Sequence, residues 1–259
     1  MKIRCSGDLY QEPIESNGCL ECALKHNGEQ PCSYGYPLLK AIFATQENEN
    51  RTNEVHVTDI TGCLLKAYLD KKNPDPPYPH DLLYLFLGIA IHDALNINDE
   101  FVESEISFVE NGLHGRADNV FKDTLLDTKT TRWLTPSKLP YGEHENQVNI
   151  YNSVFKKNKL QIQYIDLSGP TKCKGCRIPL RMIDGVIQCS SCGYTPKSAH
   201  LGAVIYDVPS VNMQSFIDTR VAQLTLAMSN GTEPEAEPSF LCGYCAHVTC
   251  EHNHKRSMY

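Results

Sequence analysis

The sequence lacks a hydrophobic run long enough to cross a bilayer. The longest run, residues 82–91, suits a buried helix instead. No apolar stretch follows the basic residues of the opening segment MKIRCSGD, so we expect no secretory signal. The sequence also has no G-x-x-x-x-G-K-[ST] motif, which excludes an ATPase motor within this chain. These absences favour a soluble, cytoplasmic protein with no membrane contact.

Positive charge is in the minority. The 24 Lys and Arg residues face 31 Asp and Glu residues, giving a formal net charge of −7. The protein as a whole therefore does not attract nucleic acid, and any such binding needs a local basic surface. With 41% hydrophobic and 21% charged residues among 259, the composition is that of a globular protein with one sizeable domain and appendages.

Cysteine departs from this ordinary composition, with 12 residues. Without an export signal, paired cysteines indicate metal sites rather than disulfides. One group follows the spacing C-x2-C-x12-C-x2-C: Cys173, Cys176, Cys189 and Cys192. Two cysteine pairs on tight, glycine-containing turns can surround one tetrahedral ion. This spacing predicts a zinc ribbon over residues 168–200.

The other two cysteine groups are less regular. Within residues 1–45, a second zinc site is predicted from a looser set: Cys5, Cys19, Cys22 and Cys32. His26 is the alternative to Cys5 as its fourth ligand. Near the end of the chain, three cysteines form a group that is one ligand short of a four-ligand metal site: Cys242, Cys245 and Cys250. Either the distant Cys63 closes an iron–sulfur site, or His252 or His254 completes a local zinc finger, and spacing alone leaves both open.

Hydrophobic periodicity predicts a mixed α/β (α+β) fold. We expect helices over residues 58–71, 81–96, 143–157 and 211–228. Strands over 103–109, 113–121 and 124–130 form a meander, and two more strands cover 161–167 and 203–208. The polar segments 46–54 and 233–239 are interpreted as linkers.

Acidic residues and a lysine on adjacent predicted strands form the candidate site. Residues two apart in a strand project from the same face, so Asp127 and Lys129 are neighbours with the Thr128 carbonyl between them. Asp118, on the adjoining strand, is expected to meet that face. Two carboxylates, a carbonyl and an ammonium suit a divalent cation with an oriented water. Taken alone, a D-x-K triplet more often marks a solvated ion pair.

The order of the surrounding residues adds context. His92 ends the apolar helix before the meander, and Gln147 and Tyr151 share one face of the following helix. The series His92, Gly115-x-x-Asp118, Asp127-x-Lys129 and Gln147-x-x-x-Tyr151 resembles the RecB-like branch of the PD-(D/E)XK nucleases. Cys63 before this core and the three cysteines after it resemble its iron–sulfur version, which includes the CRISPR-associated RecB-like exonucleases. The resemblance spans about residues 57–250, without the ribbon.

This resemblance implies a central mixed β-sheet flanked by helices: a nuclease core over 57–240 that contains the ribbon, and a C-terminal [4Fe–4S] region over 241–259 closed by Cys63. It implies a site for Mg²⁺ or Mn²⁺ formed by His92, Asp118, Asp127 and Thr128. Lys129 would position the attacking water, and Gln147 and Tyr151 would orient the substrate or the lysine. The last cysteine gap is one residue shorter than the family pattern, which keeps the zinc finger open.

The function implied by the resemblance is a DNA exonuclease that acts on single strands or free ends. Its setting would be CRISPR adaptation, with an integrase as partner, or replication and recombination, in a cell or a virus. A site-specific endonuclease is a variant on the same core. The alternative is a non-enzymatic zinc protein, which binds nucleic acid or acts as a scaffold and carries a degenerate nuclease core.

Overall fold

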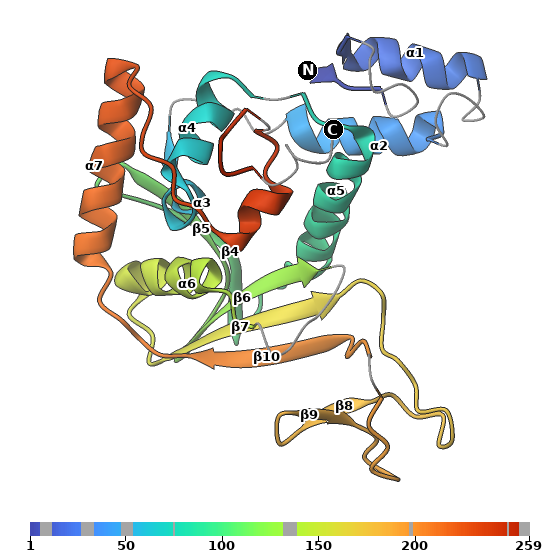
Figure 1. The fold of residues 1–259 in the computed structure, drawn as a ribbon. Coiled ribbons are helices and arrows are strands. Elements are labelled where there is room, and N and C mark those ends of the chain that lie inside the picture. The colour runs from blue at the N-terminus through green and yellow to red at the C-terminus, as the bar shows by residue number, and fades with distance from the viewer. Residues whose placement is uncertain are drawn as a thin grey trace. The chain divides into compact units, whose positions relative to one another are not determined.

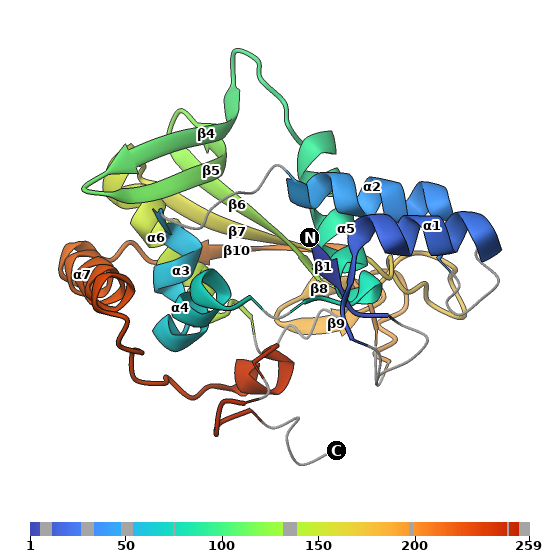
Figure 2. The ribbon, with the colours of Figure 1, turned by 90° about the horizontal axis from the view of Figure 1, so that it is seen from above.

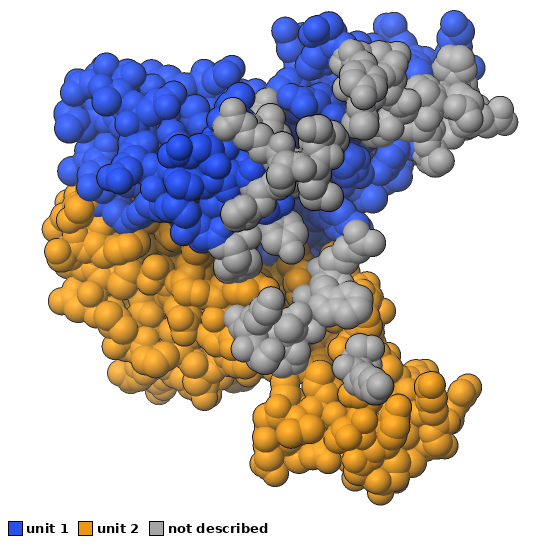
Figure 3. Space-filling view, viewed as in Figure 1, with its two compact units in different colours: residues 1–55, 62–93, 220–259 blue, residues 56–61, 94–219 orange. Residues whose placement is uncertain are grey.

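The computed structural model describes residues 1–5, 12–26, 34–47, 54–74, 76–131, 139–196, 199–247 and 249–253. Two compact units make up the chain. Unit 1 comprises residues 1–55, 62–93 and 220–259, and unit 2 comprises residues 56–61 and 94–219 (Figure 3). The candidate strands and the ribbon belong to unit 2, whereas His92 and the C-terminal cysteines belong to unit 1.

Unit 2 is built on a mixed β-sheet. Its long strands are β4 (Val102–Glu110), β5 (Leu113–Phe121), β6 (Thr124–Thr131), β7 (Lys159–Asp166) and β10 (Ala203–Val208). The order is β10-β7-β6-β5-β3, where β3 is the short strand Val55–His56, and β4 pairs with β5. Figure 2 shows β4 and β5 as a long hairpin. The predicted central mixed sheet is confirmed.

Helices cover one face of this sheet (Figure 1). Strands β6 and β7 are parallel, so the chain must cross over between them, and α6 (Gly142–Phe155) makes that crossing. This helix packs on β5, β6 and β7, and α3 (Val57–Thr61) packs on α6 and β5. The packing brings residues of α6 next to the strands that carry the candidate acidic residues.

Local sequence explains the strand boundaries of the meander. Asn111 and Gly112, with φ values of 50° and 78°, close the β4–β5 hairpin, and both are residues that tolerate positive φ. Residues of β7 alternate between buried and partly exposed, with Leu160, Ile162 and Tyr164 facing the core. Both β5 and β10 begin and end at the predicted residues.

The prediction of one helix over residues 58–71 is wrong. The segment forms two helices, α3 and α4 (Leu64–Lys72), with a break at Gly62 and Cys63. Cys63 is extended, with φ −66° and ψ 121°, and precedes the first residue of α4. Its position places the thiol at the start of a helix rather than on the side of one.

The ribbon forms a separate small sheet between β7 and β10. Strands β8 (Arg181–Ile183) and β9 (Val186–Gln188) are antiparallel. Its own small core consists of Cys173, Leu180 and Cys189, with partly buried neighbours. At the base, Asp166 Oδ2 lies 2.8 Å from His200 Nδ1 and Asp166 Oδ1 accepts the Ser168 N–H at 2.8 Å, so both ends of the insertion attach to β7.

Unit 1 contains an N-terminal helical layer that the hydrophobic pattern did not predict. Strands β1 (Lys2–Ile3) and β2 (Ile14–Glu15) pair, followed by α1 (Ser16–His26) and α2 (Tyr36–Glu47). Leu39, Ile42 and Phe43 of α2 pack with Ile3 and with Leu82 of α5 (Pro79–Ala94). The remaining elements are η2 (Phe240–Tyr244) and most of α7 (Gln214–Asn230). No helix in the described part of the chain has the length and apolar character needed to span a membrane.

Candidate functional site

The candidate site in unit 2 lies where the β5–β6 ladder ends. The two strands pair at Val120–Leu125 and Asn119–Leu126, and the pairing stops there. Continuing the register would place Asp118 opposite Asp127. Instead, the carboxylate Oδ2 of Asp118 accepts the backbone N–H of Thr128 at 2.6 Å. The side chain of Asp118 therefore replaces a ladder hydrogen bond and is fixed beside β6.

Asp127 is the most buried charged residue of this group, with 1% of its surface exposed. Its Oδ2 lies 2.9 Å from Lys129 Nζ, on the same face of β6. Among the described residues, neither oxygen of Asp127 accepts a hydrogen bond, so Lys129 meets it as an ion pair outside hydrogen-bond geometry. A buried carboxylate with few hydrogen-bond donors around it is stabilised by a nearby cation. This is the environment expected of a metal-binding carboxylate.

Helix α6 supplies the next two predicted residues. Gln147 Nε2 donates a hydrogen bond to Tyr151 Oη at 2.7 Å, and both side chains are buried. Burial and the negative charges of Asp127 and Asp118 raise the pKa of the Tyr151 hydroxyl far above its usual value. Tyr151 therefore keeps its proton beside these two negative charges.

Sequence reasoning missed His144, which lies one turn before Gln147 on the same face of α6. Its Nδ1 is 2.8 Å from Tyr164 Oη, and that hydroxyl also accepts the Tyr141 N–H at 3.2 Å. Burial and the nearby ammonium of Lys129 lower the pKa of His144 to about 3. His144 is thus a neutral imidazole beside the lysine. A histidine at the start of a helix carries no sequence signal for this role.

Glu105 is a second residue that sequence reasoning missed. The register of β4 and β5 places Glu105 opposite Asp118. Glu105 has a φ of 56°, and the strand pairing is interrupted there, between the pairs Ser104–Asn119 and Ile106–Ala117. A carboxylate oxygen of Glu105 lies within 4.8 Å of one of Asp118. Arg116 Nε lies 2.6 Å from Glu105 Oε2 and offsets part of the charge. Alternation along the strand gives no hint of this local reversal.

The remaining predicted ligand, His92, lies in the last turn of α5 in unit 1. Its place among the metal ligands stays a prediction. The sequence also offers Arg132, Trp133 and Lys138, in the loop between β6 and α6, as candidate DNA-contacting residues, and these three lie outside the described residues.

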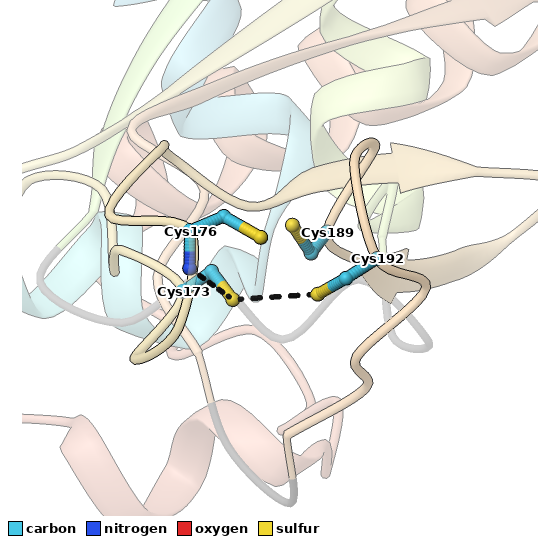
Figure 4. Close-up of side chains that lie close together, drawn as sticks. All are labelled: Cys173, Cys176, Cys189 and Cys192. Atoms are coloured by element: carbon cyan, nitrogen blue, oxygen red, sulfur yellow. Dashed lines mark hydrogen bonds between the residues drawn. The ribbon is translucent and has the colours of Figure 1, made fainter.

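The four ribbon cysteines form the clearest potential metal centre. Their thiols point toward one another from two turns (Figure 4), and all four sulfur atoms lie within 4.8 Å of one another. Cys173 Sγ and Cys192 Sγ are 3.7 Å apart. A tetrahedron with metal–sulfur bonds of about 2.3 Å has edges of about 3.8 Å. This cluster can hold a metal ion.

Electrostatics within the ribbon also favour a cation. The backbone N–H of Cys192 lowers the pKa of Cys189 to about 7. The backbone N–H of Tyr194 lowers the pKa of Cys192, but the neighbouring thiols Cys176, Cys189 and Cys173 outweigh it and raise that pKa to about 12. The neighbouring thiols therefore oppose ionisation of Cys192, and a positive charge between them would relieve this.

The C-terminal cysteines lie in unit 1 beside α4. The thiol of Cys63 accepts the Glu237 N–H at 3.5 Å, and that of Cys242 accepts the Ser239 N–H at 3.3 Å. Two residues of one short segment thus contact both thiols. Among the described residues, Cys63 and the three C-terminal cysteines do not form a group whose sulfurs all lie within 4.8 Å.

The segment 233–239, predicted as a linker, is anchored at Glu237. Its carboxylate accepts the Leu64 N–H at 2.9 Å and two hydrogen bonds from Arg220, at 2.5 and 2.8 Å. The Arg220 guanidinium lowers the pKa of Glu237. Asp70 of α4 also holds His247, with Oδ1 2.7 Å from Nε2. These contacts bring the start of α4 and the C-terminal cysteines to one region of unit 1.

The N-terminal group is only partly described. Cys19 and Cys22 lie on α1, and Cys19 packs into the core with Ile3 and Ala23. Within the described residues, Cys5, Cys19 and Cys22 form no group with sulfurs within 4.8 Å. Cys32, His254 and the side chain of His26 lie outside the described residues. The second zinc site stays a prediction.

Comparisons with known proteins support the fold alone. No family model matches the chain, and no curated protein matches it. Four chains of solved structures match. One of them, described as the crystal structure of SSO0001, is 18% identical and superposes with a TM-score of 0.52, over 83% of this chain and 95% of that one. At this identity the likeness extends to the mixed α/β architecture.

Proposed function

We propose that this chain is a metal-dependent deoxyribonuclease of the PD-(D/E)XK type, an exonuclease acting on single strands or DNA ends. The observation that carries the proposal is the convergence in unit 2 of Asp118, Asp127 and Lys129 with the Gln147–Tyr151 pair of α6. An isolated D-x-K pair on a solvated face would not explain why Asp127 is only 1% exposed, or why its charge and that of Asp118 act on the buried Tyr151.

In this proposal, Asp118, Asp127 and the Thr128 carbonyl hold Mg²⁺ or Mn²⁺, with His92 as the predicted further ligand. When bound, the ion supplies a Lewis acid for the phosphate and lowers the pKa of a water. Asp127 and Thr128 are buried and Asp118 is half-buried, and this anionic donor set fits such a hard cation.

The chain's own side chains then position the reactants. The Lys129 ammonium, 20% exposed, can reach a phosphate oxygen and offset the negative charge that develops there. Tyr151 keeps its proton and is held by Gln147, so it orients the groups around the carboxylates. The neutral His144 beside Lys129 adds no competing positive charge.

The cysteines would supply structural or redox centres rather than the hydrolytic one. The ribbon spacing and the 3.7 Å sulfur separation support zinc at Cys173, Cys176, Cys189 and Cys192. Cys63 with Cys242, Cys245 and Cys250 would hold the [4Fe–4S] cluster, supported by N–H···S hydrogen bonds like those that tune such clusters. By resemblance, the activity would serve CRISPR adaptation or replication and recombination.

Two measurements test this proposal. Anaerobically purified protein should contain about four irons per chain, together with zinc, and it should digest linear single-stranded DNA when Mn²⁺ is added. Lys129→Ala should abolish digestion and keep the metal content, whereas Lys122→Ala, at an exposed turn after β5, should digest at the parent rate. Parent-like digestion by the Lys129→Ala protein would refute the proposed site.

The same experiment separates the competing functions. Colourless protein with zinc alone and no Mn²⁺-dependent digestion would favour a non-enzymatic zinc protein. Cleavage of circular single strands into discrete fragments would favour an endonuclease, and loss of linear strands alone would favour the exonuclease.

A further inference from the structure

Charge is distributed unevenly between the ribbon and the rest of the chain. Residues 168–200 contain five Lys and Arg and one Asp, a formal +4, so the other residues carry (24 − 5) − (31 − 1) = −11. Four thiolates around one Zn²⁺ add about −2, which still leaves the ribbon positive. A positive module on an acidic protein needs a structural or a functional reason.

Four of these basic residues occupy the ten positions 172–181, which contain no acidic residue: Lys172, Lys174, Arg177 and Arg181. All four are exposed, and none forms an ion pair with a described residue. Within the described part of the chain they therefore do not stabilise the ribbon through salt bridges.

The first cysteine turn holds these cations close together. Cys173 N–H donates to the Ile178 carbonyl at 2.8 Å, and Arg177 N–H donates to the Cys173 carbonyl at 2.9 Å. A β-bridge pairs Lys172 with Pro179. The backbone folds back on itself within a few residues, so the four exposed basic residues lie on one short, hydrogen-bonded segment.

The second cysteine turn exposes an aromatic ring. Tyr194 is 43% exposed, while its carbonyl accepts the Cys189 N–H at 2.9 Å, which fixes its backbone next to the cysteines. An exposed aromatic ring on the same small module as several cations is the combination that holds single-stranded nucleic acid: cations contact phosphates and the ring stacks on a base.

We infer that the ribbon is the surface by which this acidic protein grips single-stranded DNA, through Lys172, Lys174, Arg177 and Arg181 and through stacking on Tyr194. The inference rests on the proposed function for the class of substrate. A single strand fits better than a protein partner, because an acidic peptide would use the cations but would leave the tyrosine without a base to stack on.

The test measures binding rather than cleavage, by fluorescence anisotropy of an oligothymidylate over a series of salt concentrations, with Ca²⁺ as the divalent ion. One full-length variant combines Lys172→Gln, Lys174→Gln, Arg177→Asn and Arg181→Gln. Asn is chosen at position 177 because φ there is 62°. A matched control removes four exposed cations elsewhere: Lys2→Gln, Lys25→Gln, Lys72→Gln and Lys122→Gln.

Both variants change the net charge equally, so they separate local binding from overall attraction. For single strands, the slope of log K against log salt changes by about 0.7 for each phosphate that the protein no longer neutralises. The ribbon variant should therefore flatten the slope by up to about 2.8, and the control by less than about 0.7. Tyr194→Leu should weaken binding at least about fivefold with little change in slope.

Parent-like affinity and slope in the ribbon variant, or no binding by the parent, would overturn the inference. Zinc analysis shows whether each variant keeps its ribbon. If the combined variant loses zinc, Lys172→Gln with Lys174→Gln must flatten the slope by about 1.4, or the inference fails. A protein that binds DNA through the ribbon but does not digest it would refute only the proposed nuclease activity. A protein that digests DNA but binds it equally well in the ribbon variant would refute only the proposed role of the ribbon.

Discussion

Replacing Lys129 with methionine tests the ion pair at the centre of the proposed active site. Asp127 is 1% exposed and its Oδ2 lies 2.9 Å from Lys129 Nζ. Methionine retains an unbranched apolar stem but has no charge. The Lys129→Met protein therefore keeps most of the packing and leaves a buried carboxylate without its ammonium partner.

The expected cost follows from the burial of the pair. Removing one partner of a buried ion pair costs about 3–5 kcal/mol of folding free energy. Because Lys129 is 20% exposed, solvent screens part of the attraction, and we expect a loss of about 3 kcal/mol. A divalent cation bound at Asp127 would replace the missing charge. Added Mn²⁺ should therefore stabilise the Lys129→Met protein more than it stabilises the parent.

Urea unfolding followed by circular dichroism, with and without added Mn²⁺, measures both effects. Lys122→Met is the control, because Lys122 is exposed and forms no ion pair with the described residues. Its unfolding free energy should stay within about 0.5 kcal/mol of the parent value. Equal unfolding free energies for the parent and Lys129→Met, or equal responses to Mn²⁺, would refute the reasoning.

Three further changes test the packing and the charges around the proposed active site and the metal centre of the ribbon. Gly115→Ala should lower the unfolding free energy in urea by about 1–3 kcal/mol, because a Cβ at Gly115 would lie 2.2 Å from the Phe108 ring. The control Gly142→Ala should be nearly neutral, because no atom lies within 4 Å of a Cβ built there. The pKa of His144 in the folded protein, about 3, lies below its value in the unfolded chain. The unfolding free energy of the parent should therefore fall by up to about 1.4 kcal/mol per pH unit as pH falls from about 6.5 toward 3, and His144→Gln should lack this contribution. Equal slopes of unfolding free energy against pH, measured by urea unfolding, would contradict this reasoning. Cys189→Ser should release the ribbon metal and expose residues 168–200 to proteolysis, while the main sheet stays folded. The control Ser191→Ala should keep the metal and stay resistant to proteolysis. Metal analysis and limited trypsin digestion measure these two effects.

Local sequence predicts most strands of unit 2 because each boundary has a local cause. The Asn111–Gly112 turn accommodates positive φ and fixes where β4 ends and β5 begins. The helix break at Gly62 and Cys63 has no comparable signal, since one glycine costs a helix only about 1 kcal/mol. That break depends on distant residues: Arg220 donates to the Gly62 carbonyl, and Glu237 accepts the Leu64 N–H.

The site shows the same division between local and tertiary information. Alternation in a strand was enough to expect Asp127 and Lys129 on one face, and helical spacing was enough to pair Gln147 with Tyr151. His144 could not be found in this way. Its environment comes from the parallel register that sets Lys129 beside Tyr164, and the register depends on how β7 returns after α6.

Strand pairing is interrupted on both sides of β5, and the acidic residues of the proposed site lie at these interruptions. The β4–β5 ladder omits the position where Glu105 faces Asp118, and the β5–β6 ladder ends before Asp118 reaches Asp127. Three acidic residues thus lie at one level of three adjacent strands, where backbone hydrogen bonds are missing and like charges repel. Stability alone would favour continuous ladders and apolar side chains at this level. An arrangement that costs folding free energy and leaves carboxylates together is the kind that persists when a cation binds there.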